Sequence, residues 1–222
     1  MSKVSVVLFD AYGTLFDVYA VGQTAESLFP GQGKALANLW RDRQIDYTRL
    51  RALSGQYKAF WNITQDALEY ACEALGLPLS EQARRALLEV YSRLPAYDEC
   101  AQVLEALRAK GIRTGILSNG DPAMLSKAIE SAGLGHHLDA VLSADALQTF
   151  KTNPAVYQYG LDQMGVGSEQ TLFVSSNGWD VCGASWFGLR TFWVNRAKLP
   201  RERLDIAPTH EGSNLLGVMD LL

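Results

Sequence analysis

The chain has 222 residues, of which 48% are hydrophobic, and its formal net charge at pH 7 is −4. This length suits a main domain with a smaller insertion, and the apolar content excludes a disordered chain. Basic residues form no patch with interleaved aromatic residues, which is the usual footprint of a nucleic-acid-binding protein. We therefore expect no nucleic-acid partner.

The cysteines and the apolar runs indicate the compartment. Cys72, Cys100 and Cys182 are scattered, with no CxxC motif and no His/Cys cluster, which is typical of a reducing cytosol without structural zinc. No apolar run approaches the roughly 18 residues of a membrane span. The apolar run near the N-terminus ends at Asp10 and is too short for a signal peptide. We expect a cytoplasmic protein with no membrane partner.

The chain begins with one short strand and continues with helices. The apolar run VVLF, residues 6–9, leads directly into Asp10 and a glycine-containing turn. From about residue 20 to residue 91, apolar residues recur at helical spacing and no strand candidate interrupts them. Ser80 is a typical N-cap for the last of these helices, because a glutamate follows it in the first turn.

From residue 97 onward, short apolar strands alternate with helices of roughly 10–15 residues, which is typical of an α/β fold with a parallel sheet covered on both faces. The expected strands are IRTGILS, DAVLSA, TLFVSS and RTFWVN, and the expected helix starts are Asp121-Pro122 and Asn153-Pro154. The first strand joins the same sheet. Residues 1–16 and 97–222 therefore form the expected core, and residues 17–96 an inserted helical domain.

Reactive and polar side chains stand just past four of the expected strands. In open α/β sheets, ligands bind outside the carboxyl ends of the strands. The residues at these positions are Asp10, Ser118, Asn119, Lys151, Ser175, Ser176, Asn177 and Asp180. Two carboxylates, a lysine and several hydroxyl and amide groups thus converge on one edge, which the helical insertion is placed to cover.

Each of these residues also has a structural explanation. An aspartate at a strand end usually caps a turn, a single lysine is usually a solvated charge, and Asp180 at a helix start is favoured by the helix dipole. Matching polar groups at four strand ends nevertheless favour a functional site. Among the aromatic residues, we assign Trp61 to the core, and Phe60 and Trp179 to the wall of an apolar substrate pocket.

The strand ends carry four motifs in order: DxxGTL at Asp10–Leu15, SNG at Ser118–Gly120, Lys151, and an acidic loop that ends at Asp180. Together they resemble the haloacid dehalogenase superfamily, in which an aspartate attacks the substrate and forms a covalent intermediate. The stretches DAYGTLFD, LWRDRQIDYT, LSNGDPAML, FKTNPAVYQ and FVSSNGWDVCGA are similar to signatures of the L-2-haloacid dehalogenases within it. The resemblance implies a Rossmann-like parallel sheet core with an inserted all-helical cap.

Tyr12 distinguishes this chain from the phosphatases of the same superfamily. Those enzymes carry a second aspartate two residues after the nucleophile, which protonates the leaving alkoxide, and they bind Mg²⁺. A halide leaving group needs no proton, so Tyr12 is compatible with displacement at carbon. The loop SSNGWD also holds one carboxylate where metal-binding relatives carry more, which leaves a hard cation short of oxygen ligands. We predict no metal and no cofactor, with Lys151 supplying the positive charge.

The resemblance implies a two-step mechanism. Asp10 attacks C2 of a small (S)-2-haloalkanoic acid from behind the carbon–halogen bond and expels halide, which leaves an aspartyl ester. Water activated by Asp180 then hydrolyses the ester and releases an (R)-2-hydroxy acid, so the configuration is inverted. Lys151 holds both carboxylates ionised, because a nearby cation lowers carboxylate pKa values.

The resemblance also implies roles for the other residues. Backbone amides near Ala11 and Tyr12, with Ser118, hold the substrate carboxylate, and Arg41 and Asn119 receive the halide. The pocket wall consists of Ile45, Phe60 and Trp179, and the orienting groups are Thr14, Tyr157, Ser175 and Asn177. For Arg41 the structural alternative is a solvated charge, because three more arginines follow within ten residues. The RDRQID stretch around it is also more polar than expected.

Three other functions stay open at this point. A metal-dependent phosphatase or phosphonatase shares the fold, and a ring-opening hydrolase of a small cyclic 2-carboxylate needs the same backside attack. A catalytically silent binding protein is the third. Tyr12 argues against the first, and the joint presence of Asp10, Lys151 and Asp180 argues against the last. The resemblance suggests a homodimer, while the preferred halogen, the chain length and the physiological substrate stay open.

Overall fold

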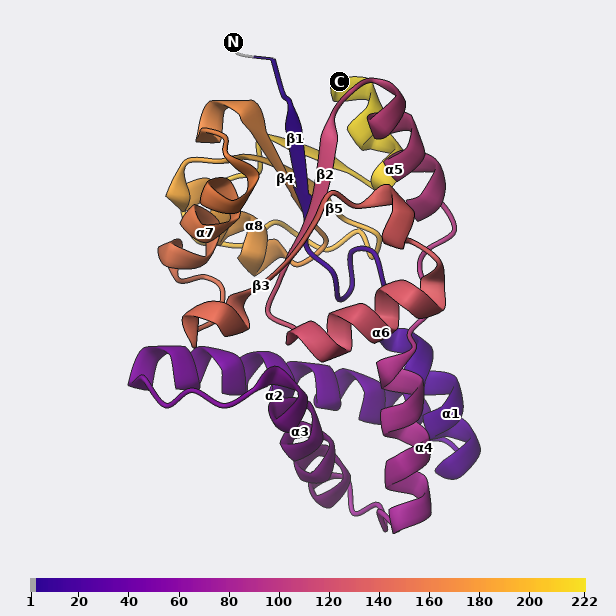
Figure 1. The fold of residues 1–222 in the computed structure, drawn as a ribbon. Coiled ribbons are helices and arrows are strands. Elements are labelled where there is room, and N and C mark those ends of the chain that lie inside the picture. The colour runs from indigo at the N-terminus through magenta and orange to yellow at the C-terminus, as the bar shows by residue number, and fades with distance from the viewer. Residues whose placement is uncertain (1–2) are drawn as a thin grey trace.

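The computed structural model describes residues 3–222, which fold around a six-stranded parallel β-sheet (Figure 1). The strand order is β3-β2-β1-β4-β5-β6, which places β1 between β2 and β4. The strands are β1 (Val6–Phe9), β2 (Arg113–Ser118), β3 (Ala140–Ser143), β4 (Thr171–Ser175), β5 (Arg190–Val194) and β6 (His210–Gly212). The expected α/β fold is confirmed. The sequence did not predict β6, because its three residues are largely exposed and form no apolar run.

Successive residues of the strands point into two separate core layers. Val6 and Leu8 pack in one layer with α7 (Pro154–Met164) and α8 (Gly178–Phe187). Val7 and Phe9 pack in the other layer. That layer contains α5 (Cys100–Ala109), α6 (Pro122–Ala132) and the 3-10 helix η5 (Leu215–Leu221). Because both faces are covered, the central strand β1 is apolar and fully buried throughout, and the reactive side chains lie beyond the strand ends.

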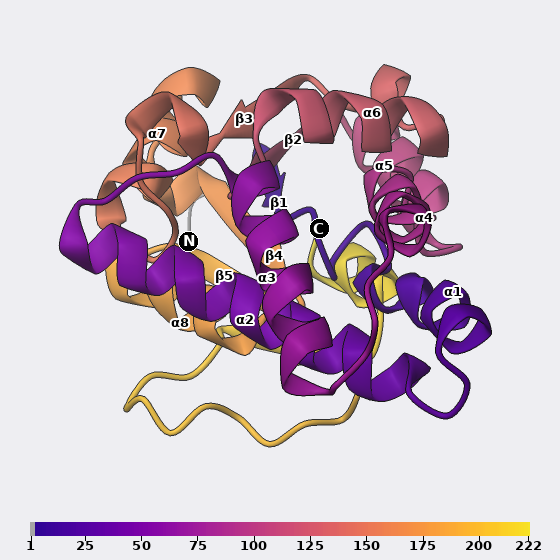
Figure 2. The ribbon, with the colours of Figure 1, turned by 90° about the horizontal axis from the view of Figure 1, so that it is seen from below.

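Four helices lie beyond the carboxyl ends of the strands, at the bottom of Figure 1 and in front of the sheet in Figure 2. They are α1 (Val21–Leu28), α2 (Gly33–Ser54), α3 (Phe60–Ala74) and α4 (Glu81–Ser92). Ser80 caps α4, as predicted, by accepting from the Ala83 N–H at 3.2 Å. Within residues 3–222, none of the helices has the length and apolar character that crossing a bilayer requires.

The chain enters and leaves this helical segment side by side. The Asp17 N–H donates to the Pro95 carbonyl at 2.9 Å. The Tyr97 N–H donates to the Leu15 carbonyl at 3.0 Å. The two connections between the sheet and the helical segment therefore form one short antiparallel pairing directly beneath β1.

The predicted caps of α6 and α7 are both present. Asp121 Oδ1 accepts from the Met124 N–H at 3.2 Å, and Asn153 Oδ1 accepts from the Ala155 N–H at 3.0 Å. Asp121 has a second contact, because its Oδ2 accepts from the Trp61 N–H at 3.0 Å and so joins the start of α3 to α6.

Trp61 differs from its predicted place in the core. Its side chain is only partly buried and packs against the core from outside. The inward-facing position on the first turn of α3 belongs instead to Phe60, which is 3% exposed.

Replacing Asp121 or Asn153 by alanine should destabilise the protein by different amounts. Each change removes one N-cap in front of a proline, worth about 1 kcal/mol, but Asp121→Ala also deprives the Trp61 N–H of its acceptor. We expect Asp121→Ala to lower the free energy of unfolding by about 1 kcal/mol more than Asn153→Ala, as measured by urea denaturation. Equal losses would show that the contact with Trp61 adds nothing to stability.

Candidate active site

A buried lysine lies between two buried carboxylates at the carboxyl edge of the sheet. Lys151 Nζ donates to Asp10 Oδ1 at 3.0 Å and to Asp180 Oδ2 at 2.8 Å. The side chains of Lys151 and Asp180 are 0% exposed and that of Asp10 is 8% exposed. Asp10 follows β1 and Asp180 lies in the first turn of α8, after the neighbouring β4. The Asp10–Lys151–Asp180 triad therefore sits where the strand order reverses, the usual ligand position in such sheets.

The charges within the triad depend on one another. Burial by itself lowers the pKa of Lys151, but the charges and hydrogen bonds of Asp10 and Asp180 outweigh it, so this pKa lies above its usual value. Burial raises the pKa of Asp180 to about 6, against the pull of the Lys151 ammonium, and the charge of Asp10 adds to the rise. Lys151 thus acts on Asp180 in the predicted direction, although burial has the larger effect. Asp180 is ionised at neutral pH and basic enough to accept a proton.

The carboxylate of Asp10 is held in one orientation. Besides Lys151 at Oδ1, its Oδ2 accepts from Thr14 Oγ1 at 2.9 Å and from Asn177 Nδ2 at 2.8 Å. Thr14 Oγ1 in turn accepts from the Ser176 N–H at 2.8 Å. Three donors from three different loops therefore fix the position from which Asp10 can attack.

Tyr157 and Ser175 lie behind these groups. The Tyr157 hydroxyl donates to Asp180 Oδ1 at 2.8 Å, so each oxygen of Asp180 accepts one hydrogen bond from the protein. A carboxylate oxygen has more than one lone pair, so Asp180 can still accept from a water. Ser175 Oγ accepts from the Asn177 N–H at 3.1 Å and shapes the loop rather than contacting Asp10.

Unpaired donors surround the attacking position. Within residues 3–222, the backbone N–H groups of Ala11 and Tyr12 have no acceptor. Ser118 Oγ accepts from the Gly120 N–H at 3.0 Å, and its own hydrogen is free. Asn119 Oδ1 accepts from the Lys151 N–H at 2.8 Å, which turns the Asn119 amide nitrogen to the other side, toward the pocket. This arrangement can bind one anionic substrate and a second, smaller anion.

These groups face one narrow pocket between the sheet edge and the helical segment. The residues that line it are Asp10, Tyr12, Arg41, Ile45, Thr48, Phe60, Ser118, Asn119, Asn177 and Trp179. Of the predicted site residues, Thr14, Lys151, Tyr157, Ser175 and Asp180 lie behind this lining, and Ala11 contributes its backbone. The structure therefore gathers the predicted residues around one buried centre.

Arg41 reaches this centre from α2. It is 8% exposed, unlike the solvated arginine that was its alternative. Its Nη2 donates to the Tyr12 carbonyl at 3.1 Å and to Asn177 Oδ1 at 3.3 Å.

Thr48 was not predicted, although the sequence contained a signal for it. Arg41, Ile45 and Thr48 follow at helical spacing, so they share the face of α2 that lines the pocket.

Tyr12 stands where the phosphatases carry their second aspartate, and its ring forms part of an apolar wall there. It stacks on Tyr91 with ring centroids 5.9 Å apart and packs against Phe60 at 6.0 Å. Burial raises the pKa of Tyr12 well above its usual value. No carboxylic acid therefore stands at this position to protonate a leaving oxygen.

The donor set does not resemble a metal site. The ammonium of Lys151 already fills the space between the two carboxylates. In the part of the chain from residue 3 onward, no group of three or more His, Cys, Asp or Glu side chains is placed to hold a metal ion. The metal-free and cofactor-free site remains a prediction.

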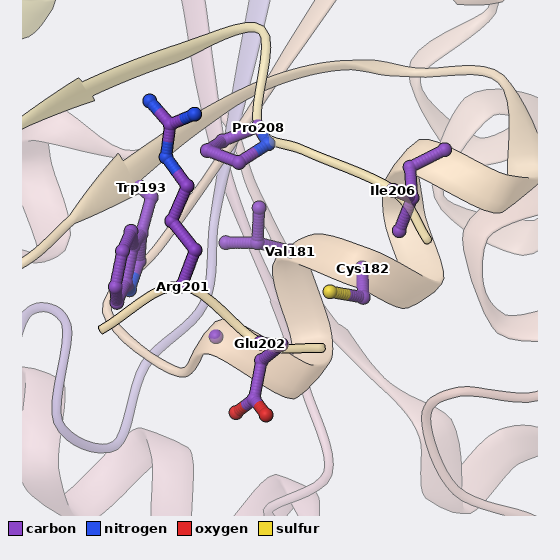
Figure 3. A pocket seen from close by; sticks show the side chains of 8 residues that line it. Val181, Cys182, Trp193, Arg201, Glu202, Ile206 and Pro208 are labelled. Atoms are coloured by element: carbon purple, nitrogen blue, oxygen red, sulfur yellow. The ribbon is translucent and has the colours of Figure 1, made fainter. Parts of the chain in front are cut away.

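A second, shallow hollow lies on a different face of α8 (Figure 3). Val181 and Cys182 of α8 line it together with Trp193 of β5 and with Ile206 and Pro208 of the following loop. No member of the Asp10–Lys151–Asp180 triad faces it. Its contribution to the site is indirect: the indole Nε1 of Trp193 donates to the Ser176 carbonyl at 3.1 Å and so steadies the loop after β4.

The fold is that of a haloacid dehalogenase-like hydrolase: the model of that family matches residues 4–188, and the chain belongs to it. The chain is 39% identical to the (S)-2-haloacid dehalogenase of Pseudomonas putida, over 97% of this chain and 95% of that protein. The structure of the L-2-haloacid dehalogenase RSc1362 superposes with a TM-score of 0.97 at 51% identity, covering 99% of both chains.

A further solved structure is the L-2-haloacid dehalogenase of Xanthobacter autotrophicus with chloropropionic acid covalently bound. It superposes with a TM-score of 0.92 at 36% identity and covers 99% of this chain and 98% of that chain. The suspected superfamily and its L-2-haloacid dehalogenase branch are thereby confirmed.

Replacing Tyr157 by phenylalanine should raise the pKa of Asp180 above about 6, because the hydrogen bond from Tyr157 stabilises the ionised carboxylate. Carbon-13 NMR titration of labelled aspartate measures this pKa directly. Tyr159→Phe on the same helix is the matched control and should leave it unchanged. An unshifted Asp180 in Tyr157→Phe would show that this hydroxyl does not set its ionisation.

Proposed function

We propose that the chain hydrolyses small (S)-2-haloalkanoic acids to (R)-2-hydroxy acids and halide, through an aspartyl ester on Asp10. The observation that carries this is the triad itself: a fixed carboxylate faces a small pocket, a separate carboxylate lies behind it, and an ammonium joins them. With Tyr12 in place of a proton donor, the arrangement suits a leaving group that departs as a stable anion. The named relatives support the same reaction class.

The substrate carboxylate is bound by the donors at the ends of β1 and β2. The N–H groups of Ala11 and Tyr12 and the hydroxyl hydrogen of Ser118 have no acceptor among the residues that the structure describes, and they can satisfy both carboxylate oxygens. The alkyl group then lies against Ile45, Phe60 and Trp179. Fixing the carboxylate, the alkyl group and the halogen at three places selects one enantiomer.

In the first step, an oxygen of Asp10 forms a bond to C2 while the carbon–halogen bond breaks and the halide leaves with the bonding electron pair. No proton is transferred. Arg41 and the amide nitrogen of Asn119 receive the halide, which stabilises the charge as it develops. Thr14, Asn177 and Lys151 keep Asp10 aligned for attack, so the displacement is effectively intramolecular.

In the second step, a water bound to Asp180 loses a proton to that carboxylate and attacks the carbonyl carbon of the Asp10 ester. The tetrahedral intermediate expels the 2-hydroxy acid oxygen, which takes up the proton that Asp180 had accepted. The second proton of the water is released to solvent, and the Asp10 carboxylate is regenerated. The negative charge of Asp10 is absent in the ester, which removes one cause of the raised pKa of Asp180. Asp180 is therefore more fully ionised when its base function is needed.

We also propose that residues 17–96 form a cap domain on a core of residues 1–16 and 97–222. The lining of the pocket supports this, because Arg41, Ile45 and Phe60 of the helical segment cover the carboxyl edge of the sheet beside Asp10. The paired connections near Asp17 and Tyr97 are the two points at which the chain passes between core and cap. From the sequence patterns we further propose a cytoplasmic protein that needs no metal or cofactor and binds neither nucleic acid nor membrane, and by family resemblance we propose a homodimer.

A substrate panel tests the proposed reaction. With (S)-2-chloropropionate and chloroacetate we expect halide release that dialysis against EDTA does not change, and with p-nitrophenyl phosphate we expect no turnover. Asp10→Ala should lose all activity, because both steps pass through its carboxylate. Near-wild-type activity of that variant would remove Asp10 as the nucleophile.

Two further results would favour the other hydrolases of this fold. Phosphate release that requires Mg²⁺ would favour the phosphatase. Opening of a small cyclic 2-carboxylate, without halide release from the haloacids, would favour the ring-opening hydrolase.

A further inference from the structure

A buried polar network holds Arg41 from the side of the helical segment. Gln44 lies one turn after Arg41 on α2 and is 0% exposed, as is Thr64 on α3. Gln44 Oε1 accepts from Arg41 Nη1 at 2.7 Å and from the Tyr91 hydroxyl on α4 at 3.0 Å. Gln44 Nε2 donates to Thr64 Oγ1 at 2.6 Å. Three helices thus meet at one amide group.

The neighbours of Gln44 determine which way its amide points. Thr64 donates its only hydroxyl hydrogen to the Phe60 carbonyl at 2.8 Å, so Thr64 Oγ1 can only accept from Gln44. The amide nitrogen must therefore face Thr64, and the amide oxygen must face Arg41 and Tyr91. A second bond, from Trp40 Nε1 to the Thr64 carbonyl at 2.8 Å, holds this part of α3 in place.

The network continues from Arg41 to the nucleophile. Arg41 Nη2 donates to Asn177 Oδ1 at 3.3 Å and to the Tyr12 carbonyl at 3.1 Å. Asn177 Nδ2 donates to Asp10 Oδ2 at 2.8 Å. An unbroken chain of hydrogen bonds therefore links α3 and α4, through Gln44 and Arg41, to the attacking carboxylate. Because the guanidinium is planar and rigid, holding Nη1 and Nη2 fixes where its other hydrogens point.

We propose that Gln44 is a positioning residue that aims the free guanidinium hydrogens of Arg41 at the departing halide. The inference rests on the proposed dehalogenase function. As the bond from C2 to the halogen breaks, the halide gathers negative charge, and donors already in place stabilise it without reorganisation. Chloride is a poorer leaving group than bromide, so its departure depends more on stabilisation by these donors. Misaiming Arg41 should therefore slow loss of chloride more than loss of bromide.

The test is Gln44→Met, which keeps the volume of the side chain and removes its hydrogen-bonding groups. We expect kcat/KM for (S)-2-chloropropionate to fall about tenfold, because a bond to a charged group is lost. The fall for (S)-2-bromopropionate should be smaller, and added bromide should inhibit less strongly. Gln65→Met is the matched control on α3, because Gln65 contacts surface groups and no residue of the site. It should leave both substrates unchanged.

A second variant keeps the test decisive if Gln44→Met does not fold. Thr64→Val is nearly isosteric and removes the oxygen that orients the Gln44 amide, so it should show the same preference for bromide with a smaller loss. Equal proportional losses for the two substrates, or unchanged bromide inhibition, would overturn the positioning role and leave Gln44 as a structural residue. A wild-type protein that releases no halide from either substrate would instead refute the proposed function.

Discussion

The burial of the Lys151 ammonium between Asp10 and Asp180 is the constraint on which the rest of the site depends. A charge without access to water is tolerated only when it is paired and hydrogen-bonded, and Lys151 is 0% exposed with a carboxylate on each side. The pairing requires the ends of β1 and β4 to be neighbours, which the strand order provides. One cation thereby stabilises a nucleophile and a base in the same buried space.

The sheet and the helical segment supply different parts of the chemistry. In the proposed mechanism, the sheet edge contributes the groups that form and hydrolyse the ester, which lie between the strand ends and the following helices and in the first turn of α8. The helical segment contributes Arg41 and the apolar wall of the pocket, to which the proposal assigns the leaving group and the alkyl chain. The Tyr12 ring follows the sheet edge but extends the apolar wall, since it packs against both Phe60 and Tyr91 of the helical segment. A halide needs no proton, so this position is free to serve packing.

The sequence predicts the sheet and its reactive edge well, because apolar runs that end in polar residues are local signals. Asp10, Lys151 and Asp180 could be assigned from their positions after strands and from family motifs. Gln44 could not be assigned from the sequence, because it lies in a polar stretch that gives no sign of burial. Its burial depends on Thr64 and Tyr91, which reach it only once three helices have packed. The raised pKa of Asp180 could not be predicted from the sequence either, because its main cause is burial, which depends on the whole fold.

The central claim, a covalent ester on Asp10, is tested most directly by following oxygen through one turnover. Excess enzyme is mixed with (S)-2-chloropropionate in ¹⁸O-labelled water, and both the product and the peptide that contains Asp10 are analysed by mass spectrometry. If Asp10 attacks C2, its own oxygen leaves with the product and solvent oxygen enters the carboxylate. The account predicts unlabelled 2-hydroxy acid and a labelled Asp10 peptide. Labelled product with an unlabelled Asp10 peptide would contradict it.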